Sequence, residues 1–75
     1  MQELEATMKE DKELILHYLF QAVKRTRAGE DVVDMKFHSG SEDVVVIWKN
    51  GFRRLVNVEA DSGIAMIRDV LGAIR

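Results

Sequence analysis

The 75-residue sequence has no cysteine and no proline, and only five glycines and one tryptophan. Without cysteine there is no disulfide, no thiolate metal ligand and no thiol nucleophile, so the fold does not need an oxidising compartment. The N-terminal segment MQELEATMKEDKE is acidic, whereas a secretory signal is basic and then apolar. No apolar run approaches the roughly 18 residues that span a bilayer. We therefore expect a cytoplasmic protein without a membrane segment.

Hydrophobic residues make up 47% of the chain and charged residues 32%, a balance typical of a folded soluble protein. The length suits one domain over residues 1–75, with residues 1–6 as an N-terminal extension that frays. A domain of this size buries only about 60% of the surface that its unfolded chain exposes, so its stability is small. A partner or a second copy would add to that stability.

The net charge of −2 is distributed in alternating blocks along the chain. The two basic clusters are Lys24, Arg25 and Arg27, and then Lys49, Arg53 and Arg54. Phosphate binding grows with the number of cations that converge on one face, and blocks of alternating sign do not favour such convergence. The charge pattern indicates a solvated surface more than a nucleic-acid site.

Apolar spacing predicts a helix at each end of the chain. The first covers residues 7–28, with Thr7 and Glu10 as a reciprocal cap and Gly29 in the left-handed conformation after its last turn. A start near Gln2 is an alternative. The last helix follows a cap at Asp61 or Ser62 and runs to the C-terminus. Its predicted core stripe consists of Ile64, Ile67, Leu71 and Ile74, with Met66 and Val70 at the shoulder.

Three strands are predicted between these helices. Apolar and polar residues alternate over 33–38, residues 44–48 form the run with the strongest strand propensity, and 52–58 returns after Asn50 and Gly51. That pair is typical of a two-residue type I′ hairpin turn. The predicted fold class is therefore α+β with the order αβββα, a three-stranded antiparallel meander with both helices packed on one face.

A two-residue turn pairs Val46 with Leu55 and Val45 with Val56. One sheet face then collects Val45, Ile47, Phe52, Val56 and Val58, which we expect to form the core. The other face is predicted as a partner interface that consists of Val44, Val46, Trp48, Arg53 and Leu55. In the alternative assignment the helices cover this second face and leave Val45, Ile47 and Val56 exposed. In either case one apolar face stays open, which favours an interaction surface.

Catalytic machinery is not apparent in the sequence. His17 and His38 are the only histidines, and no serine stands in the sequence context of a nucleophile. A metal site from His38, Glu42 and Asp43 lacks a defined ligand spacing. We therefore expect no enzymatic activity, no cofactor and no metal.

Nucleic-acid binding is the alternative function. Lys49, Arg53 and Arg54 are near Trp48, on which a base could stack. The order αβββα is also that of the double-stranded RNA-binding domain, but the last helix here starts at Asp61–Ile64, without the lysines that family uses for phosphate contacts.

The segment WKNGFRRLVNVEADSGIAMIRDVLGAIR resembles small proteins of bacterial prophages and mobile elements over residues 44–75. In size and element order the chain also resembles phage anti-CRISPR inhibitors. That resemblance implies a phage-encoded inhibitor in the host cytoplasm, with a Cas nuclease as its protein partner. It also implies an acidic patch where DNA would bind, here Glu30, Asp31, Asp34, Glu42 and Asp43. The sequence thus predicts a non-enzymatic protein-interaction module that binds a protein partner, a second copy of itself as a homodimer, or both.

Overall fold

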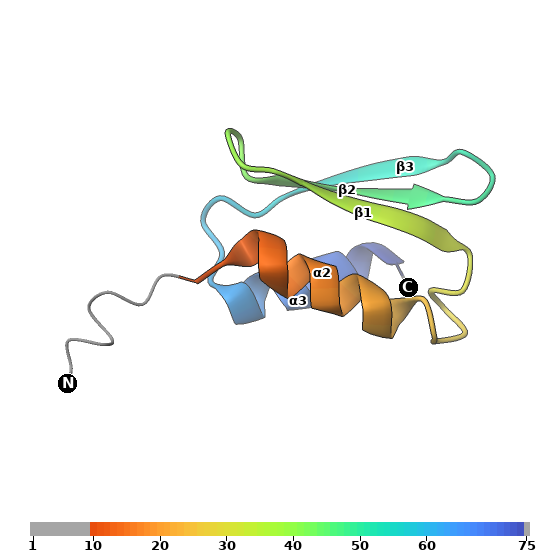
Figure 1. Cartoon of the computed structure of the whole chain (residues 1–75). Coiled ribbons are helices and arrows are strands. Elements are labelled where there is room, and N and C mark those ends of the chain that lie inside the picture. Colours follow the sequence, from red (N-terminus) through yellow and green to blue (C-terminus); the bar gives the residue numbers. More distant parts are fainter. Residues whose placement is uncertain (1–9, 75) are drawn as a thin grey trace.

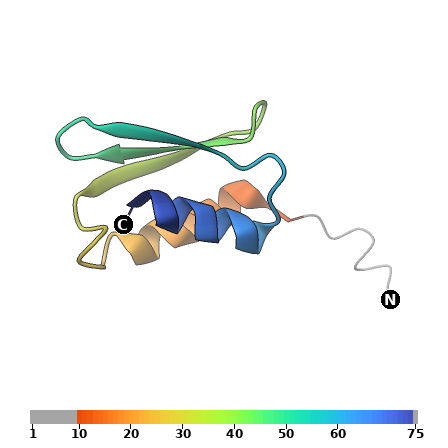
Figure 2. The same cartoon turned by 180° about the vertical axis from the view of Figure 1, so that it is seen from behind.

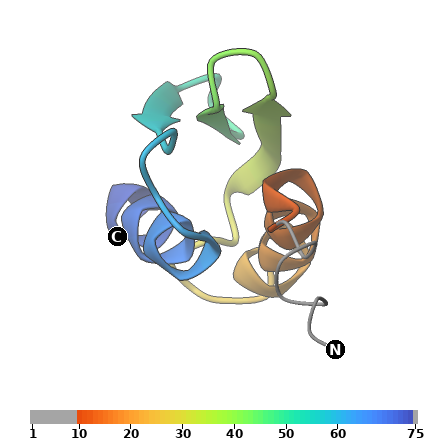
Figure 3. The same cartoon turned by 90° about the vertical axis from the view of Figure 1, so that its left-hand side faces the viewer.

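A computed structural model describes residues 10–74 of the chain. Its elements are α2 (Lys12–Val23), β1 (Val32–His38), β2 (Asp43–Trp48), β3 (Arg53–Asn57) and α3 (Gly63–Ile74). The strands form one antiparallel sheet in the order β1-β2-β3, and both helices lie beneath the same face of it (Figures 1 and 3). This confirms the predicted α+β layout, αβββα with a three-stranded meander.

Helix α2 is shorter than the predicted helix at both ends. Its N-cap is Asp11, whose carboxylate accepts the Leu14 N–H at 3.0 Å. The predicted cap at Thr7 lies outside the described residues, and Glu10 is used elsewhere in the fold. Asp11 begins the helix because an Asp side chain satisfies an N–H that the first turn leaves without a partner.

Thr26 ends α2 earlier than predicted. Its hydroxyl donates to the Val23 carbonyl at 2.7 Å and accepts the Gly29 N–H at 3.0 Å. The prediction of a left-handed Gly29 was wrong, because Gly51 is the only glycine in residues 10–74 with a positive φ. Gly29 is instead required by close packing, since a Cβ at this position would collide with the Val23 side chain and carbonyl.

The hairpin between β2 and β3 has a three-residue turn where a two-residue turn was predicted. Trp48 donates its N–H to the Phe52 carbonyl at 2.8 Å, and Gly51 donates its N–H to the Trp48 carbonyl at 2.9 Å. Gly51 has a φ of 90°, which a glycine adopts without steric cost. Asn50 accepts the Phe52 N–H through its side chain at 3.0 Å. This is the type I turn followed by a left-handed residue that is common in three-residue hairpins.

The longer turn shifts the register of β3 by one residue. Val44 pairs with Val56 and Val45 with Leu55, whereas the predicted register paired Val45 with Val56. Because side chains alternate between the two faces of a strand, a slip of one residue exchanges the faces of the whole strand. The predicted division of the sheet into core and open faces was therefore wrong. The observed register determines which side chains are exposed on the face that the helices do not cover.

Strand β1 contains an irregularity that its alternating sequence did not indicate. The register with β2 shifts between Val32 and Asp34, so Val33 is the extra residue of a bulge. Val32 is 3% exposed and Val33 is 51% exposed, although the alternation predicted Val33 to face inward. From Asp34 onward the strand alternates regularly, and Met35 packs into the core.

The core lies between the inner sheet face and the two helices. Its fully enclosed side chains are Leu16, Val44, Val46, Val58, Met66 and Val70. In α3 the predicted stripe is rotated, because Met66 and Val70 are 0% exposed while Ile64 is 75% exposed. Met66 and Val70 were predicted only at the shoulder of that stripe.

Long-range polar contacts tie the start of α2 to the far end of the chain. The Glu10 carboxylate accepts the Gly63 N–H at 2.8 Å and so caps α3. The Lys12 ammonium donates to the Val58 carbonyl at 2.7 Å and to Glu42 Oε1 at 2.8 Å. Helices α2 and α3 run in the same direction (Figures 1 and 2) and lie side by side (Figure 3).

Candidate functional site

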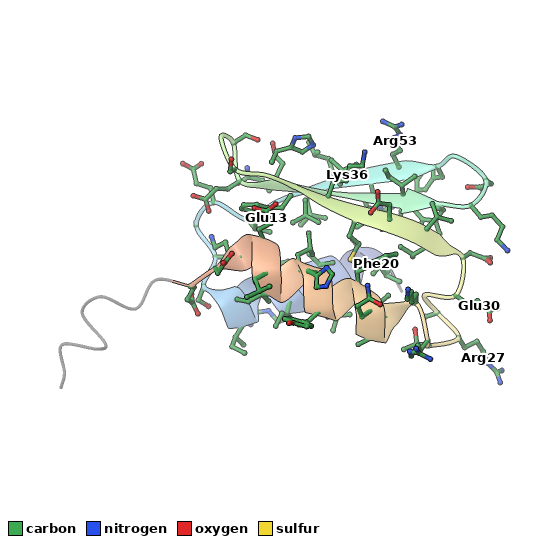
Figure 4. The ribbon with its side chains drawn as sticks, in the orientation of Figure 1. Glu13, Phe20, Arg27, Glu30, Lys36 and Arg53 are labelled. Atoms are coloured by element: carbon green, nitrogen blue, oxygen red, sulfur yellow. The ribbon has the colours of Figure 1, made fainter. Side chains whose placement is uncertain are left out.

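The outer face of the sheet is the surface that neither helix covers. We call it the open sheet face. It consists of nine residues: Asp34, Lys36, His38, Asp43, Val45, Ile47, Arg53, Leu55 and Asn57. Lys36 and Arg53 point away from the helices in Figure 4, whereas Phe20 lies on the helix side of the sheet. None of the nine residues is buried.

Strand pairing arranges these nine residues in three rows across the sheet. The first row is Asp34, Ile47 and Arg53, the second is Lys36, Val45 and Leu55, and the third is His38, Asp43 and Asn57. Directly opposed residues in antiparallel strands have their Cβ atoms about 5 Å apart on the same face. Each row therefore runs as a line of neighbours from β1 across β2 to β3.

The centre of the open sheet face is apolar. Val45 and Ile47 are partly buried on the central strand β2, and Leu55 is 63% exposed beside Val45 on the edge strand β3. Charged groups flank this apolar centre, with Lys36 on β1 and Arg53 on β3. An apolar centre with a polar rim is the usual composition of a protein interface.

Asp43 is fixed at one end of this face. Its carboxylate accepts the Asn57 amide at 2.8 Å, and the same amide reaches the Ser41 carbonyl at 3.3 Å. A hydrogen bond from the Ser41 side chain, followed by that of Asn57 and the charge of His38, lowers the pKa of Asp43 below 3.8. The Asp43 carboxylate therefore favours its ionised form and is hydrogen-bonded to Asn57.

The predicted partner interface is divided between the two faces of the sheet. Val44 and Val46 are 0% exposed under the helices, so the expectation that they face outward was wrong. Trp48 is partly buried against the core and contacts Phe52 at 5.3 Å between ring centroids. Arg53 and Leu55 do lie on the open sheet face.

The predicted basic cluster does not gather at one place. Lys49 lies in the hairpin turn, 3.6 Å from the Asp31 carboxylate. Arg53 is on the open sheet face, and Arg54 pairs with Val46 on the opposite face. Arg53 and Arg54 therefore lie on opposite faces of β3, Lys49 lies in the turn, and Trp48 is packed against the core.

The predicted acidic patch is likewise split between the two ends of the sheet. Glu30 and Asp31 precede β1, and Asp34 follows at the same end. Glu42 and Asp43 lie at the other end of the strand, roughly 20 Å away at about 3.3 Å per residue. Figure 4 shows Glu30 beside the turn that follows α2, at the opposite end of the molecule from Glu13.

A second candidate, which the sequence pattern did not indicate, is a shallow hollow of about 630 Å³ beside the start of α2. Its lining consists of Glu10, Asp11, Lys12, Glu13, Phe37, Ser39, Glu42 and Glu59. Lys12 pairs with Glu42, whose backbone has a positive φ of 57°. These carboxylates come from distant parts of the chain, so only the folded structure reveals that they are neighbours. Their surplus negative charge attracts cations in general.

Among the described residues, Asp61 has a buried side-chain oxygen that no hydrogen-bond donor contacts. Its Oδ2 atom is enclosed and has no hydrogen-bond partner. The neighbouring Asp69 carboxylate, and then desolvation, raise the pKa of Asp61 above 3.8. Ser62 takes the capping role, since its hydroxyl accepts the Ala65 N–H at 3.2 Å. The pair of carboxylates is a point of electrostatic strain at the start of α3.

Within residues 10–74, no group of three metal-ligating side chains is found. Of the set considered from sequence, Glu42 is held by Lys12 and Asp43 by Asn57. No helix in this part of the chain combines the length and apolar character needed to cross a membrane. Comparison with protein-family models, curated proteins and solved structures finds no match to this chain.

Proposed function

We propose that the chain is a non-enzymatic protein-interaction module that binds a protein partner through the open sheet face. The observation that carries this proposal is the exposure of Leu55, which is 63% accessible on the edge strand β3, on a face that no helix covers. Val45 lies directly beside it on β2. An exposed apolar side chain beside another apolar residue gains binding energy when a partner excludes water from it.

The magnitude of this effect favours a binding role. Full burial of a leucine side chain contributes about 1.5–3 kcal/mol, so the exposed part of Leu55 represents about 1–2 kcal/mol. Arginine is enriched at interface hot spots, and Arg53 stands two residues away on the same strand and face. Both residues belong to the interface that the sequence predicted.

The nucleic-acid alternative receives less support. Stacking on Trp48 needs a free ring face, and this ring is partly buried against the core and against Phe52. Phosphate binding needs cations that converge, and the basic residues of the hairpin point to different sides. The inhibitor of a Cas nuclease implied by the anti-CRISPR resemblance would present a continuous acidic surface, and the five acids in question are divided between two ends of the sheet.

Site-specific photocrosslinking in the native host cell tests the proposal. A benzoylphenylalanine replaces Leu55 in one variant and Arg54 in a matched control. The two positions are adjacent and exposed but lie on opposite faces of β3. We expect a protein adduct from position 55 and much less from position 54.

The type of adduct decides between the two functions. An adduct at position 55 that is sensitive to protease but not to nuclease supports the protein-interaction module. A nuclease-sensitive adduct supports nucleic-acid binding and overturns the proposal. Equal yields from positions 54 and 55, or no adduct at either, also overturn it.

A further inference from the structure

We propose that the open sheet face binds a second copy of itself, with the two sheets related by a two-fold axis that runs parallel to β2. This inference rests on the proposed function and adds the identity of one partner and the geometry of the contact. It is argued from the order of charges across the first row of the face, Asp34, Ile47 and Arg53.

Asp34 and Arg53 are complementary between two chains but do not meet within one. In a single chain they occupy the outer strands, about 10 Å apart at the usual strand spacing. The ion pairs of the described residues do not include this pair. Rotation about an axis parallel to β2 places β1 of one copy over β3 of the other at the same height along the strands. Asp34 then faces Arg53 of the second copy, and the pair occurs twice.

The same rotation aligns the apolar centre of the face. Ile47 meets Ile47 of the second copy, and Val45 meets Val45. Leu55 lies over Lys36 of the second copy, where the aliphatic part of the lysine covers it and the ammonium reaches water. Face-to-face sheets stack about 10 Å apart, a gap that an Asp and an Arg side chain together can bridge.

The third row explains why the other two-fold arrangement is disfavoured. An axis perpendicular to β2 places the first row over the third, so that Ile47 meets the ionised Asp43 of the second copy. Burial of that carboxylate against an apolar side chain is costly. With the parallel axis, Asp43 faces Asp43 of the second copy in the last row, at the end of the face. These two carboxylates lie at the rim of the contact and not among its apolar residues, so they stay in contact with water.

The size of the face sets the expected strength. Three strands about 4.8 Å apart and about 20 Å long give a flat area of roughly 300 Å² per copy. A standard stable interface buries about 800 Å² per partner, so this contact is weak and concentration-dependent. Sedimentation equilibrium should therefore cover protein concentrations from about 10 μM to about 1 mM at low salt.

A charge-reversal experiment tests the geometry. Asp34→Arg makes both ends of the first row positive, and Arg53→Asp makes both ends negative. Each variant alone should dimerise at least about tenfold more weakly than the unchanged chain, because like charges face each other twice. An equimolar mixture of the two variants should dimerise again, because every Arg then faces an Asp. A single chain with both substitutions should also regain dimerisation.

Arg54→Asp is the matched control. It makes the same change of charge one residue away but on the opposite face, so it should leave the dimerisation constant within about twofold of the unchanged chain. Circular dichroism on every variant verifies that it is folded. Asp34 accepts the Met35 N–H, so Asp34→Arg could unfold the chain. In that case the dimerisation constants of two separate variants, Asp34→Asn and Arg53→Asp, are compared with that of the unchanged chain.

Three results would overturn the proposal. These are a monomer at every concentration, a dimer that the Arg53 reversal does not weaken, and a mixture of reversed variants that stays monomeric. If the adduct at position 55 contains a different protein and the chain is a monomer in sedimentation, binding of a second copy is refuted. The proposal of a protein-interaction module is then supported. A lack of any adduct at position 55 refutes both.

Discussion

Replacement of Lys12 by methionine should destabilise the fold strongly, although Lys12 is a charged residue in the first turn of a helix. Its side chain is only 12% exposed, and the ammonium bridges α2 to the Val58 carbonyl and to Glu42. Methionine keeps the apolar stem but has no donor. The Val58 carbonyl, which belongs to a residue 0% exposed, then loses a charged partner.

The expected loss is the sum of two contributions. A hydrogen bond from a charged group to a buried acceptor contributes about 1.5–3 kcal/mol. The ion pair to Glu42 adds about 0.5 kcal/mol, because the Glu42 side chain is 37% exposed and water screens the interaction. A total of about 2–3.5 kcal/mol is a large part of the roughly 4–11 kcal/mol typical of a domain this size.

Thermal unfolding followed by circular dichroism, with urea unfolding as a second measure, tests this value. At about 4–8 °C per kcal/mol, the Lys12→Met variant should unfold about 10–20 °C lower. Lys36→Met is the control, because Lys36 is exposed on the open sheet face; its free energy of unfolding should change by less than about 0.5 kcal/mol. If Lys12→Met changes stability no more than Lys36→Met does, the proposed tie between α2 and the end of β3 is refuted.

Three further predictions follow from the register, the turn and the strained carboxylate. Val46→Ala should cost about 1–2.5 kcal/mol and Val45→Ala less than about 1 kcal/mol in urea unfolding, since only Val46 is fully enclosed; equal losses would contradict the observed register. Gly51→Ala should cost about 1–2 kcal/mol, because its φ of 90° is unfavourable for a residue with a Cβ, and a stability equal to that of the unchanged chain would refute this turn. Because the pKa of Asp61 is raised in the folded state, protonation of Asp61 stabilises the fold below 3.8, and this stabilisation is lost as the pH rises through the folded-state value. Asp61→Asn should therefore be more stable than the unchanged chain at pH 7 and not below pH 3.8, and the absence of that difference at pH 7 would count against repulsion by Asp69.

The element order could be predicted from the sequence because it depends on local patterns. The alternation that ends at Phe37 and the turn residues Asn50 and Gly51 each mark an element or its boundary. Ser62 was one of two predicted caps and is the one that the structure uses. Each of these signals involves residues no more than four positions apart, so it can be recognised without knowledge of the tertiary fold.

The composition of the open sheet face could not be predicted, because it depends on one residue in the turn. Asn50 and Gly51 are compatible with a two-residue turn and also with a three-residue turn that includes Lys49. The choice moves Leu55 relative to Val45 and exchanges the faces of β3. Arg53 and Leu55 were nevertheless predicted on the correct face. On β3 the register error and the wrong choice of covered face cancel each other, whereas on β2 only the wrong choice of covered face applies.

The rotation of α3 and the acidic hollow depend on contacts between distant parts of the chain. The capping contact from Glu10 to Gly63 spans 53 residues, and no local pattern indicates it. This contact is made by the first residue of α3, in which Met66 lies in the buried stripe where Ile64 was expected. The raised pKa of Asp61 also depends on the fold, because its main cause is the carboxyl group of Asp69, eight residues further along the chain.

The position of the two helices has a consequence for synthesis on the ribosome. α2 ends at Val23 and α3 begins at Gly63, so about 40 residues are translated between the two helices that lie side by side in Figure 1. At a translation rate of about 5–20 residues per second, α2 is synthesised about 2–8 s before α3, which packs against it. During that time the strands of the sheet are the described elements that can cover it. The nascent chain is therefore most vulnerable to proteolysis and aggregation before α3 emerges.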